Sequence, residues 1–334
     1  MAPHVKTLTD LIAQARALEP IRVAVVDAAQ ELVIETLREA HALGMVEPRL
    51  IGVPEAIERT CNELGWKTED RWIVPAPTDP AAAAKAVDLV RDGEVDAVMK
   101  GNIHTDALMH ALLHKERGLK APGRRVSHVF VTEVSSHPKL LGITDAAINI
   151  APDLNAKAQI LQNAVELFHL LGVETPKVAV LSAVETVNPA IASTLDAACL
   201  TLMARRGQIG GASIDGPLAF DNAISAAAAK EKGIVSEVAG EADIVLVPDL
   251  VSGNILAKNL EYLAGAVAAG VVVGLAVPVV LSSRADPPAA RLAALALASL
   301  MHHRSAKMLA KAAAPEASLP CAPQPEHACC PIAG

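Results

Sequence analysis

Short runs of apolar and β-branched residues alternate along the chain with longer Ala- and Leu-rich stretches in which apolar positions recur with the helical period. The runs that predict strands are residues 22–26, 49–53, 97–100, 126–131, 177–182, 244–248 and 278–282. Strands that alternate with helices are typical of parallel sheets covered by helices. We therefore predict an α/β fold with parallel-rich sheets.

Residues 150–153 interrupt this alternation. Asp153 stands directly before a periodic stretch at 154–171, and this predicts a helix capped by Asp153 with a domain boundary beside it. Segments 93–99 and 240–246 resemble each other, and each precedes a Gly-Asn-Ile triplet, at 101–103 and 253–255. Duplication and ordinary helix-to-strand sequence both account for this. Either way, we expect both Gly-Asn loops at the carboxyl ends of strands, where ligands bind in such sheets.

Residues 262–283 contain no charged side chain, which is long enough for a membrane span. Three glycines and Pro278 divide the segment, and its second half is β-branched, as buried parallel strands are. We predict a buried helix, a glycine turn and a core strand at 277–281, and no membrane span. Residues 1–19 are predicted to form a helix rather than a secretion signal.

The charge balance excludes some partners. The chain has 29 Lys and Arg against 37 Asp and Glu, a net charge of −8, and only 2% aromatic residues. Nucleic-acid binders show a basic face and rings that stack on bases, so we predict no nucleic-acid partner. Any anionic substrate must then be bound by a local cluster of cations.

The cysteines suggest a reducing compartment, because the count of 5 is odd and their spacing forms no disulfide framework. We therefore expect a cytoplasmic protein. Cys321, His327, Cys329 and Cys330 would suit a metal, but they lack paired ligand spacing and lie in a Pro- and Ala-rich end. A mobile tail over 313–334 is the preferred interpretation.

Two segments carry candidate chemistry at strand ends. Ser283, Arg284 and Asp286 follow the strand at 278–282. Arg presents a planar fork to phosphate oxygens, Asp can accept a proton and Ser can donate to an oxyanion. An ordinary helix N-terminus, capped by Ser283 or Asp286, explains the same residues.

The second segment follows the strand at 97–100. Lys100 supplies positive charge, Gly101 would let a ligand approach the backbone, and Thr105 or Asp106 would open a helix whose N–H groups attract anions. A plain helix cap is the alternative.

Arg124 and Arg125 enter the strand at 126–131, and strand alternation directs only one of them to a given face.

Three polar loops carry further candidate residues, and the sequence lacks common nucleotide-binding and hydrolase motifs. Loops 145–153, 213–221 and 248–254 place Asp and Asn among Gly and Pro, which suits either binding or turn formation. The sequence contains no dinucleotide fingerprint, P-loop or nucleophile elbow. The spacing of Asp88, Asp92 and Asp96 crosses Gly93, so these carboxylates cannot form one helical face for a metal.

Several segments, taken in order, resemble the phosphate acetyltransferase and phosphate butyryltransferase family. They are residues 23–25 with 50–52, 99–105, 125–128, 145–153, 215–221, 248–254 with Lys258, and 283–286. The resemblance implies a fold similar to isocitrate and isopropylmalate dehydrogenases, with the site in a cleft between two α/β domains. Domain I would comprise 1–147 and 273–312, and domain II 148–272. A homodimer is also implied.

The resemblance further implies reversible transfer of a short acyl group, acetyl or butyryl, between coenzyme A and inorganic phosphate. CoA thiolate would attack the acyl phosphate directly in a ternary complex. Coenzyme A would be a co-substrate, and no metal or bound cofactor would take part. Ser-Arg-x-Asp at 283–286 is similar to the butyryl branch, whereas the acetyl branch places its proposed base several residues later, near Ala290 here.

Carried over to this sequence, the resemblance implies three groups of site residues. The catalytic group is Ser283, Arg284 and Asp286; the phosphate-binding group is Arg284, Arg125, Lys100 and Thr105; the CoA- or acyl-binding group is Gly101, Asn102, Asn149, Asp153, Gly216, Pro217, Gly253 and Asn254. We expect Lys100, Arg125 and Arg284 to meet in one cleft. A metal- and NAD(P)-dependent dehydrogenase of the same fold and a non-catalytic CoA or phosphate binder are the alternatives.

Overall fold

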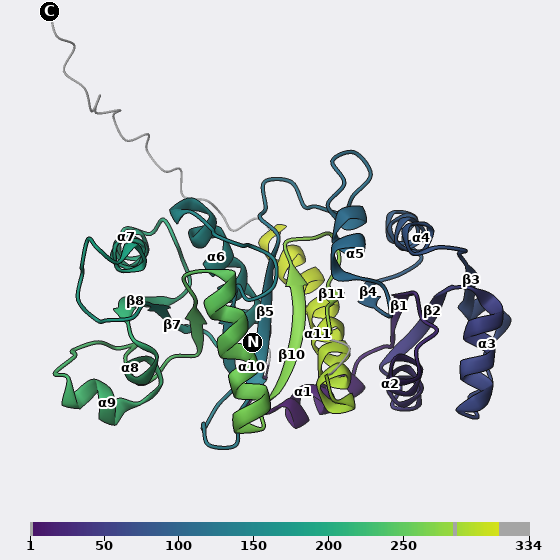
Figure 1. The fold of residues 1–334 in the computed structure, drawn as a ribbon, viewed down its shortest axis with the longest axis horizontal. Helices are drawn as coiled ribbons and strands as arrows, with labels where there is room; N and C mark the ends of the chain where they lie inside the picture. Colours follow the sequence, from purple (N-terminus) through teal and green to yellow (C-terminus); the bar gives the residue numbers. More distant parts are fainter. Residues whose placement is uncertain (1–2, 283–285, 314–334) are drawn as a thin grey trace, which may run out of the picture.

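The computed structural model describes residues 3–282 and 286–313, and in this part of the chain eleven strands form one sheet. The strands are β1 (Ile21–Val26), β2 (Val46–Gly52), β3 (Ile73–Pro75), β4 (Ala97–Lys100), β5 (Ser127–Glu133), β6 (Leu141–Thr144), β7 (Lys177–Leu181), β8 (Ser213–Leu218), β9 (Ile244–Leu246), β10 (Val267–Val273) and β11 (Val279–Val280). The predicted α/β class is therefore confirmed: helices cover both faces of a large, mostly parallel sheet (Figure 1).

The helices occupy most of the stretches between strands. They are α1 (Leu8–Arg16), α2 (Glu31–Ala42), α3 (Pro54–Glu63), α4 (Asp79–Arg91), α5 (Thr105–Leu112), α6 (Leu154–Leu170), α7 (Ala192–Arg205), α8 (Phe220–Ile224), α9 (Ala226–Glu231), α10 (Leu250–Ala264) and α11 (Pro288–Ala313), with a 3₁₀ turn at Asp70–Trp72. The predicted cap of α6 is present, because the Asp153 side chain accepts a hydrogen bond from the Ala156 N–H at 2.7 Å.

The sheet consists of two parallel groups of strands that run in opposite senses. The strand order is β3-β2-β1-β4-β11-β10-β5-β6-β9-β7-β8. Strands β3 to β11 in this order are parallel, and so are β6, β9, β7 and β8. Between the two groups, β10 is antiparallel to β11 and β5, and β5 is antiparallel to β6. The carboxyl ends of the two groups therefore lie at opposite edges of the sheet.

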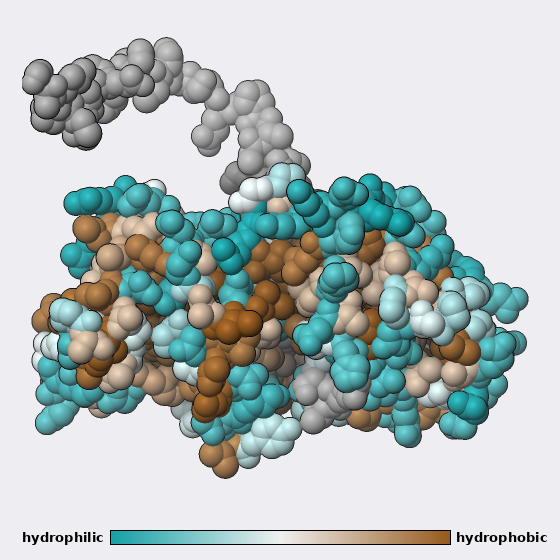
Figure 2. Space-filling view, turned by 45° about the horizontal axis from the view of Figure 1, so that its top comes forward, coloured by the Kyte–Doolittle hydropathy of each residue, from teal (hydrophilic) through white to brown (hydrophobic). Residues whose placement is uncertain are grey.

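The core is continuous on one face of the sheet and divided on the other. On the first face, α1, α2, α6 and α11 share one apolar cluster that runs across both groups of strands. On the second face, one cluster joins β1 and β4 to α4 and α5, and a separate one joins β6 and β9 to α8 and α10. The division falls at the central strands β10 and β5. Apolar surface also gathers in the middle of the face shown in the space-filling view (Figure 2).

The prediction for residues 262–283 was wrong in one part. Helix α10 ends at Ala264, with Gly265 in the left-handed region at φ 63°, and residues 267–273 form strand β10 instead of continuing a helix. The Val-rich sequence pairs with β5 along its whole length, and the turn at Gly274, φ 85°, leads back into β11. In the part of the chain that the structure describes, no helix meets the length and apolarity needed to cross a bilayer.

Candidate functional site

The segment after β4 confirms the predicted strand-to-helix transition. Lys100 is buried, and its Nζ donates to the Gly101 carbonyl at 3.3 Å. Helix α5 begins at Thr105, as expected. Gly101 has a packing role, because a Cβ there would lie 2.2 Å from the Asp27 carbonyl oxygen and 2.5 Å from that of Val26. The close approach at Gly101 is therefore between β4 and the end of β1.

Asp286 lies among charged side chains from two helices. Its carboxylate is 3.9 Å from the Lys258 Nζ of α10, and its carbonyl accepts a hydrogen bond from the Arg291 Nε of α11 at 3.3 Å. Asp286 is 8% exposed and Arg291 is 1% exposed. Burial would lower the pKa of Lys258, but its hydrogen bond to Glu261 and the Asp286 charge raise it overall. Lys258 therefore stays protonated at neutral pH.

Ser283 and Arg284 lie outside the described residues, as does the tail after residue 313. Their neighbour Ser282 is buried and directly follows Leu281 at the carboxyl end of β11. Strands β11 and β4 are parallel neighbours, so Ser282 and Lys100 lie at the same edge of the sheet.

Arg125 belongs to a second polar network. Its Nη1 donates to Asn149 Oδ1 at 2.8 Å, and Asn149 Nδ2 donates to Asp145 Oδ2 at 2.6 Å and to the Val126 carbonyl at 2.9 Å. Asp145 also accepts hydrogen bonds from the N–H groups of Ala147 and Ile148. The loop 145–149 is thus ordered around one buried carboxylate, and Arg125 is attached to it.

The structure does not bring Lys100 and Arg125 together. Val98 pairs with Val279, Val279 with Val272, and Val272 with His128. Val98 and His128 therefore lie at the same level of the sheet. Lys100 lies beyond Val98 and Arg125 precedes His128, and β4 and β5 run in the same sense, so the two residues lie toward opposite edges. Five residues of strand rise and three strand spacings separate their Cα atoms by on the order of 20 Å.

The remaining predicted residues fall into separate places. Gly253 lies in the first turn of α10, not in a loop as expected, where a Cβ would meet Ala146 at 3.1 Å; this helix start therefore packs on the Asn149 loop. Asn102, Asp153 and Asn254 are exposed. Gly216 and Pro217 lie on the edge strand β8, not in a loop as expected. A Cβ at Gly216 would lie 2.7 Å from the Val180 carbonyl oxygen, which explains the glycine by packing.

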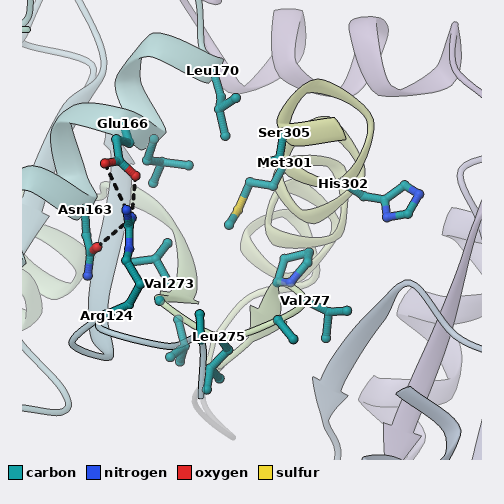
Figure 3. Close-up of a pocket in the computed structure, with 16 residues that line it drawn as sticks. Arg124, Asn163, Glu166, Leu170, Val273, Leu275, Val277, Met301, His302 and Ser305 are labelled. Carbon is teal, nitrogen blue, oxygen red and sulfur yellow. Dashed lines mark hydrogen bonds and ion pairs between the residues drawn. The ribbon is translucent and has the colours of Figure 1, made fainter. Parts of the chain in front are cut away.

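Arg124 diverges from Arg125 and borders a cavity of about 620 Å³ between α6, α11 and the turn from β10 to β11. Its guanidinium forms an ion pair with Glu166 and donates to Asn163 Oδ1 at 3.0 Å. Met301 and Leu170 point into the cavity, and His302 points away from it (Figure 3). None of the predicted site residues that the structure describes lines this cavity.

The comparison with known families decides the assignment. Residues 77–298 match the family described as "Phosphate acetyl/butaryl transferase". The chain belongs to this family. The matched segment contains every site residue inferred from the sequence resemblance, from Lys100 to Asp286.

Individual members of this family and a solved structure are similar to the chain over most of its length. A phosphate acetyltransferase from Rhizobium meliloti is 50% identical over 290 residues, which cover 87% of this chain and 92% of that protein. A phosphate butyryltransferase from Clostridium acetobutylicum is 42% identical over 297 residues, covering 89% and 98%. The crystal structure of a branched-chain phosphotransacylase from Enterococcus faecalis V583 gives a TM-score of 0.74 at 33% identity, covering 85% and 99%.

Three polar residues of this family member were not identified as site residues from the sequence. Lys258 entered only as part of a motif, and Arg291 stands in an Ala- and Leu-rich helix where its buried contact with Asp286 gives no sequence signal. His128 also stood in a motif, and burial lowers its pKa to about 4 although the Asp145 carboxylate opposes this shift. Among the residues that the structure describes, no group of three or more His, Cys, Asp or Glu is placed to bind a metal.

Proposed function

We propose that this protein is a phosphate acyltransferase that transfers an acetyl or butyryl group reversibly between coenzyme A and inorganic phosphate. The observation that carries the proposal is the family match over residues 77–298, which contains all the cationic and hydroxyl residues expected to bind the substrates. Coenzyme A is a co-substrate in this reaction, and no step requires a metal or a bound cofactor.

In the proposed reaction, both substrates are bound together and the CoA thiolate attacks the carbonyl carbon of the acyl phosphate. The C–S bond forms, the tetrahedral intermediate collapses, and the bond between the carbonyl carbon and the phosphate oxygen breaks. Phosphate leaves with that electron pair, and the thiol proton passes to a base. We assign the role of base to Asp286, the carboxylate that lies nearest in the sequence to Ser283 and Arg284.

Positively charged side chains around Asp286 would stabilise its carboxylate and attract phosphate to this position. Lys258 and Arg291 flank Asp286, and Lys100 lies at the same edge of the sheet as Ser282. We assign Arg284 and Ser283 to the phosphate and the tetrahedral intermediate, with Lys100 and the N-terminus of α5 at Thr105 nearby. These cations would offset the repulsion between an anionic substrate and a protein of net charge −8.

Arg125 would serve a different part of the substrates. Because Arg125 and Lys100 lie toward opposite edges of the sheet, we assign them to different phosphate groups. Coenzyme A is a long molecule with three phosphate groups, so separated cations suit it. We therefore assign Arg125, Asn149, Gly253 and Asn254 to coenzyme A, with Asn149 oriented by its hydrogen bonds to Arg125 and Asp145.

The arrangement of the sheet supports a two-domain division of the dehydrogenase-like kind. The two parallel groups of strands reverse sense at β10 and β5, and the core on one face divides there. We propose domain I as residues 1–147 and 273–312 and domain II as 148–272, with the site between them; these bounds assign β6 to domain I, although it pairs with β9 of the second group. Cys61 and Cys199 are free thiols, which suits the cytoplasm.

We also propose a homodimer that covers α10. Val251, Ile255, Tyr262 and Leu263 on this helix are 56–83% exposed, which is unusual for large apolar side chains on one element. Sedimentation velocity should show a dimer that Ile255→Lys dissociates and that Val235→Lys, at a fully exposed valine outside α10, does not. A monomeric parent protein contradicts the dimer, and a dimer that tolerates Ile255→Lys contradicts its placement.

Arsenolysis tests the proposed activity. Arsenate in place of phosphate attacks the thioester carbonyl and displaces CoA thiolate, and the acyl arsenate then hydrolyses, so thiol release continues. We expect arsenate-dependent release of CoA from acetyl-CoA, butyryl-CoA or both, and the ratio of kcat/KM for the two thioesters measures the acyl preference. Binding of CoA without turnover would instead support the non-catalytic binder, and NAD(P)H formation from a hydroxy acid the dehydrogenase.

A further inference from the structure

His128 is a buried imidazole without a hydrogen-bonding partner. Its side chain on β5 is 0% exposed, and among the described residues neither Nδ1 nor Nε2 has a partner. Its backbone, in contrast, is fully engaged, because its N–H donates to Asp145 and its carbonyl accepts from Thr144 Oγ1. Because its pKa is about 4, the ring is neutral at working pH, with one N–H donor and one acceptor nitrogen.

The position of the ring connects it with the strand that leads to the proposed catalytic segment. His128 pairs with Val272 of β10, and the neighbouring pair on the same face is Phe130 with Gly270. A Cβ on Gly270 would lie 3.0 Å from His128 Nε2, 2.9 Å from the Leu281 carbonyl oxygen and 3.1 Å from Phe130. The imidazole and the Leu281 carbonyl therefore approach the same point above Gly270, which only a residue without a side chain leaves open.

Two further contacts fix this arrangement. The His128 and Phe130 rings meet edge to face with centroids 4.4 Å apart, which sets the plane of the imidazole. The Leu281 N–H donates to the Gly270 carbonyl at 3.3 Å, which holds the end of β11 against β10. After Leu281 and Ser282, the chain reaches Ser283, Arg284 and Asp286.

We propose that His128 is a positioning residue that holds the carboxyl end of β11, through the Leu281 carbonyl, in the geometry required for acyl transfer. Since the imidazole forms no direct hydrogen bond to the described residues, the Nε2–H tautomer would donate to this carbonyl through one buried water. This inference rests on the proposed function. A buried polar ring without such a task is disfavoured, because an unsatisfied donor costs more than an apolar side chain of similar shape.

The test compares His128→Leu with Thr132→Val. Thr132 is the matched control: it lies on the same face of β5, is 1% exposed and has a hydroxyl without a partner in the described chain, but it faces Ala268. We expect His128→Leu to lower kcat of arsenolysis by roughly 10- to 100-fold with little change in the KM for acyl-CoA, and Thr132→Val to leave both unchanged. A folded His128→Leu variant with kcat within about twofold of the parent overturns the proposal.

If His128→Leu does not fold, two amide variants test the proposed role of the His128 Nε2–H. Gln can carry an N–H to the position of Nε2, whereas the shorter Asn reaches only that of Nδ1. We expect His128→Gln to retain more activity than His128→Asn. An equal or reversed order contradicts the assignment of Nε2.

Hydrogen exchange separates this inference from the proposed function, because it needs no activity. The Leu281 amide should exchange faster in His128→Leu, or in His128→Asn, than in the parent and in Thr132→Val. If the parent protein lacks arsenolysis but shows this pattern, the proposed function fails and the contact stands. Unchanged exchange of Leu281 overturns the contact whatever the activity.

Discussion

At the scale of single residues, Asp153 combines a confirmed structural role with a proposed binding role. Its carboxylate caps α6 through the Ala156 N–H, and it is exposed at the end of the loop that holds Asn149. Substitution can separate the two roles, because Asn caps helices about as well as Asp but carries no charge.

Asp153→Ala should lower the free energy of unfolding by about 1 kcal/mol, and Asp153→Asn should leave it nearly unchanged. Urea denaturation measures both. Equal stability of the Ala variant and the parent would show that the cap contributes nothing. A raised KM for acyl-CoA in the folded Asn variant would support the proposed contact between this charge and the substrate.

The Arg22–Asp96 pair should make stability depend on pH. Burial alone would raise the pKa of Asp96, but hydrogen bonds from the Arg22 side chain and N–H outweigh it and lower this pKa. Because the folded-state pKa lies below the unfolded value, Asp96 stabilises the fold above the unfolded pKa, and this contribution disappears as pH falls through the folded pKa.

Asp96→Asn should therefore be less stable than the parent protein at neutral pH, and the difference should narrow at about pH 3. Urea denaturation of both proteins at the two pH values checks this. A difference that stays constant or widens in acid would show that the charge of Asp96 does not stabilise the fold.

At the scale of elements, sequence patterns predicted most strands but not the one with the greatest consequence for the site. The run that became β10 is as apolar as a buried helix, and its identity depends on pairing with β5, which lies more than a hundred residues earlier. Gly265 and Gly274 mark its ends, but a glycine in a sequence does not reveal its φ angle. The hairpin of β10 and β11 thus depends on tertiary pairing with β5 and not on local sequence alone.

Gly101 illustrates the same difficulty at a strand end, because a close approach to a ligand and one to neighbouring backbone require the same residue. The structure predicts that Gly101→Ala destabilises the fold by about 3 kcal/mol, since its Cβ would meet two backbone carbonyl oxygens at the end of β1, those of Val26 and Asp27. Gly210→Ala is the control, because nothing lies within 4 Å of a Cβ there. Similar denaturation midpoints for the two variants would contradict the packing role.

At the scale of the whole molecule, the sequence predicted the α/β class and the family, because ordered motifs over most of the chain identify both. It could not predict that the two parallel groups run in opposite senses. This reversal follows from how β5 and β10 join them, and it separates Arg125 from Lys100. We expected these cations to meet in one cleft because each lies at the end of a strand. In the structure, however, the carboxyl ends of the two groups of strands lie at opposite edges of the sheet.

The most direct test of the central claim, acyl transfer to phosphate at a site built on Arg284, is arsenate-dependent CoA release by the parent protein, Arg284→Ala and a control, Arg206→Ala. Arg206 follows the last residue of α7 and lies outside the proposed site. We predict release with acetyl-CoA or butyryl-CoA by the parent and the control, and its loss in a folded Arg284→Ala protein. Absence of release by the parent with both thioesters, or undiminished release by Arg284→Ala, would contradict the claim.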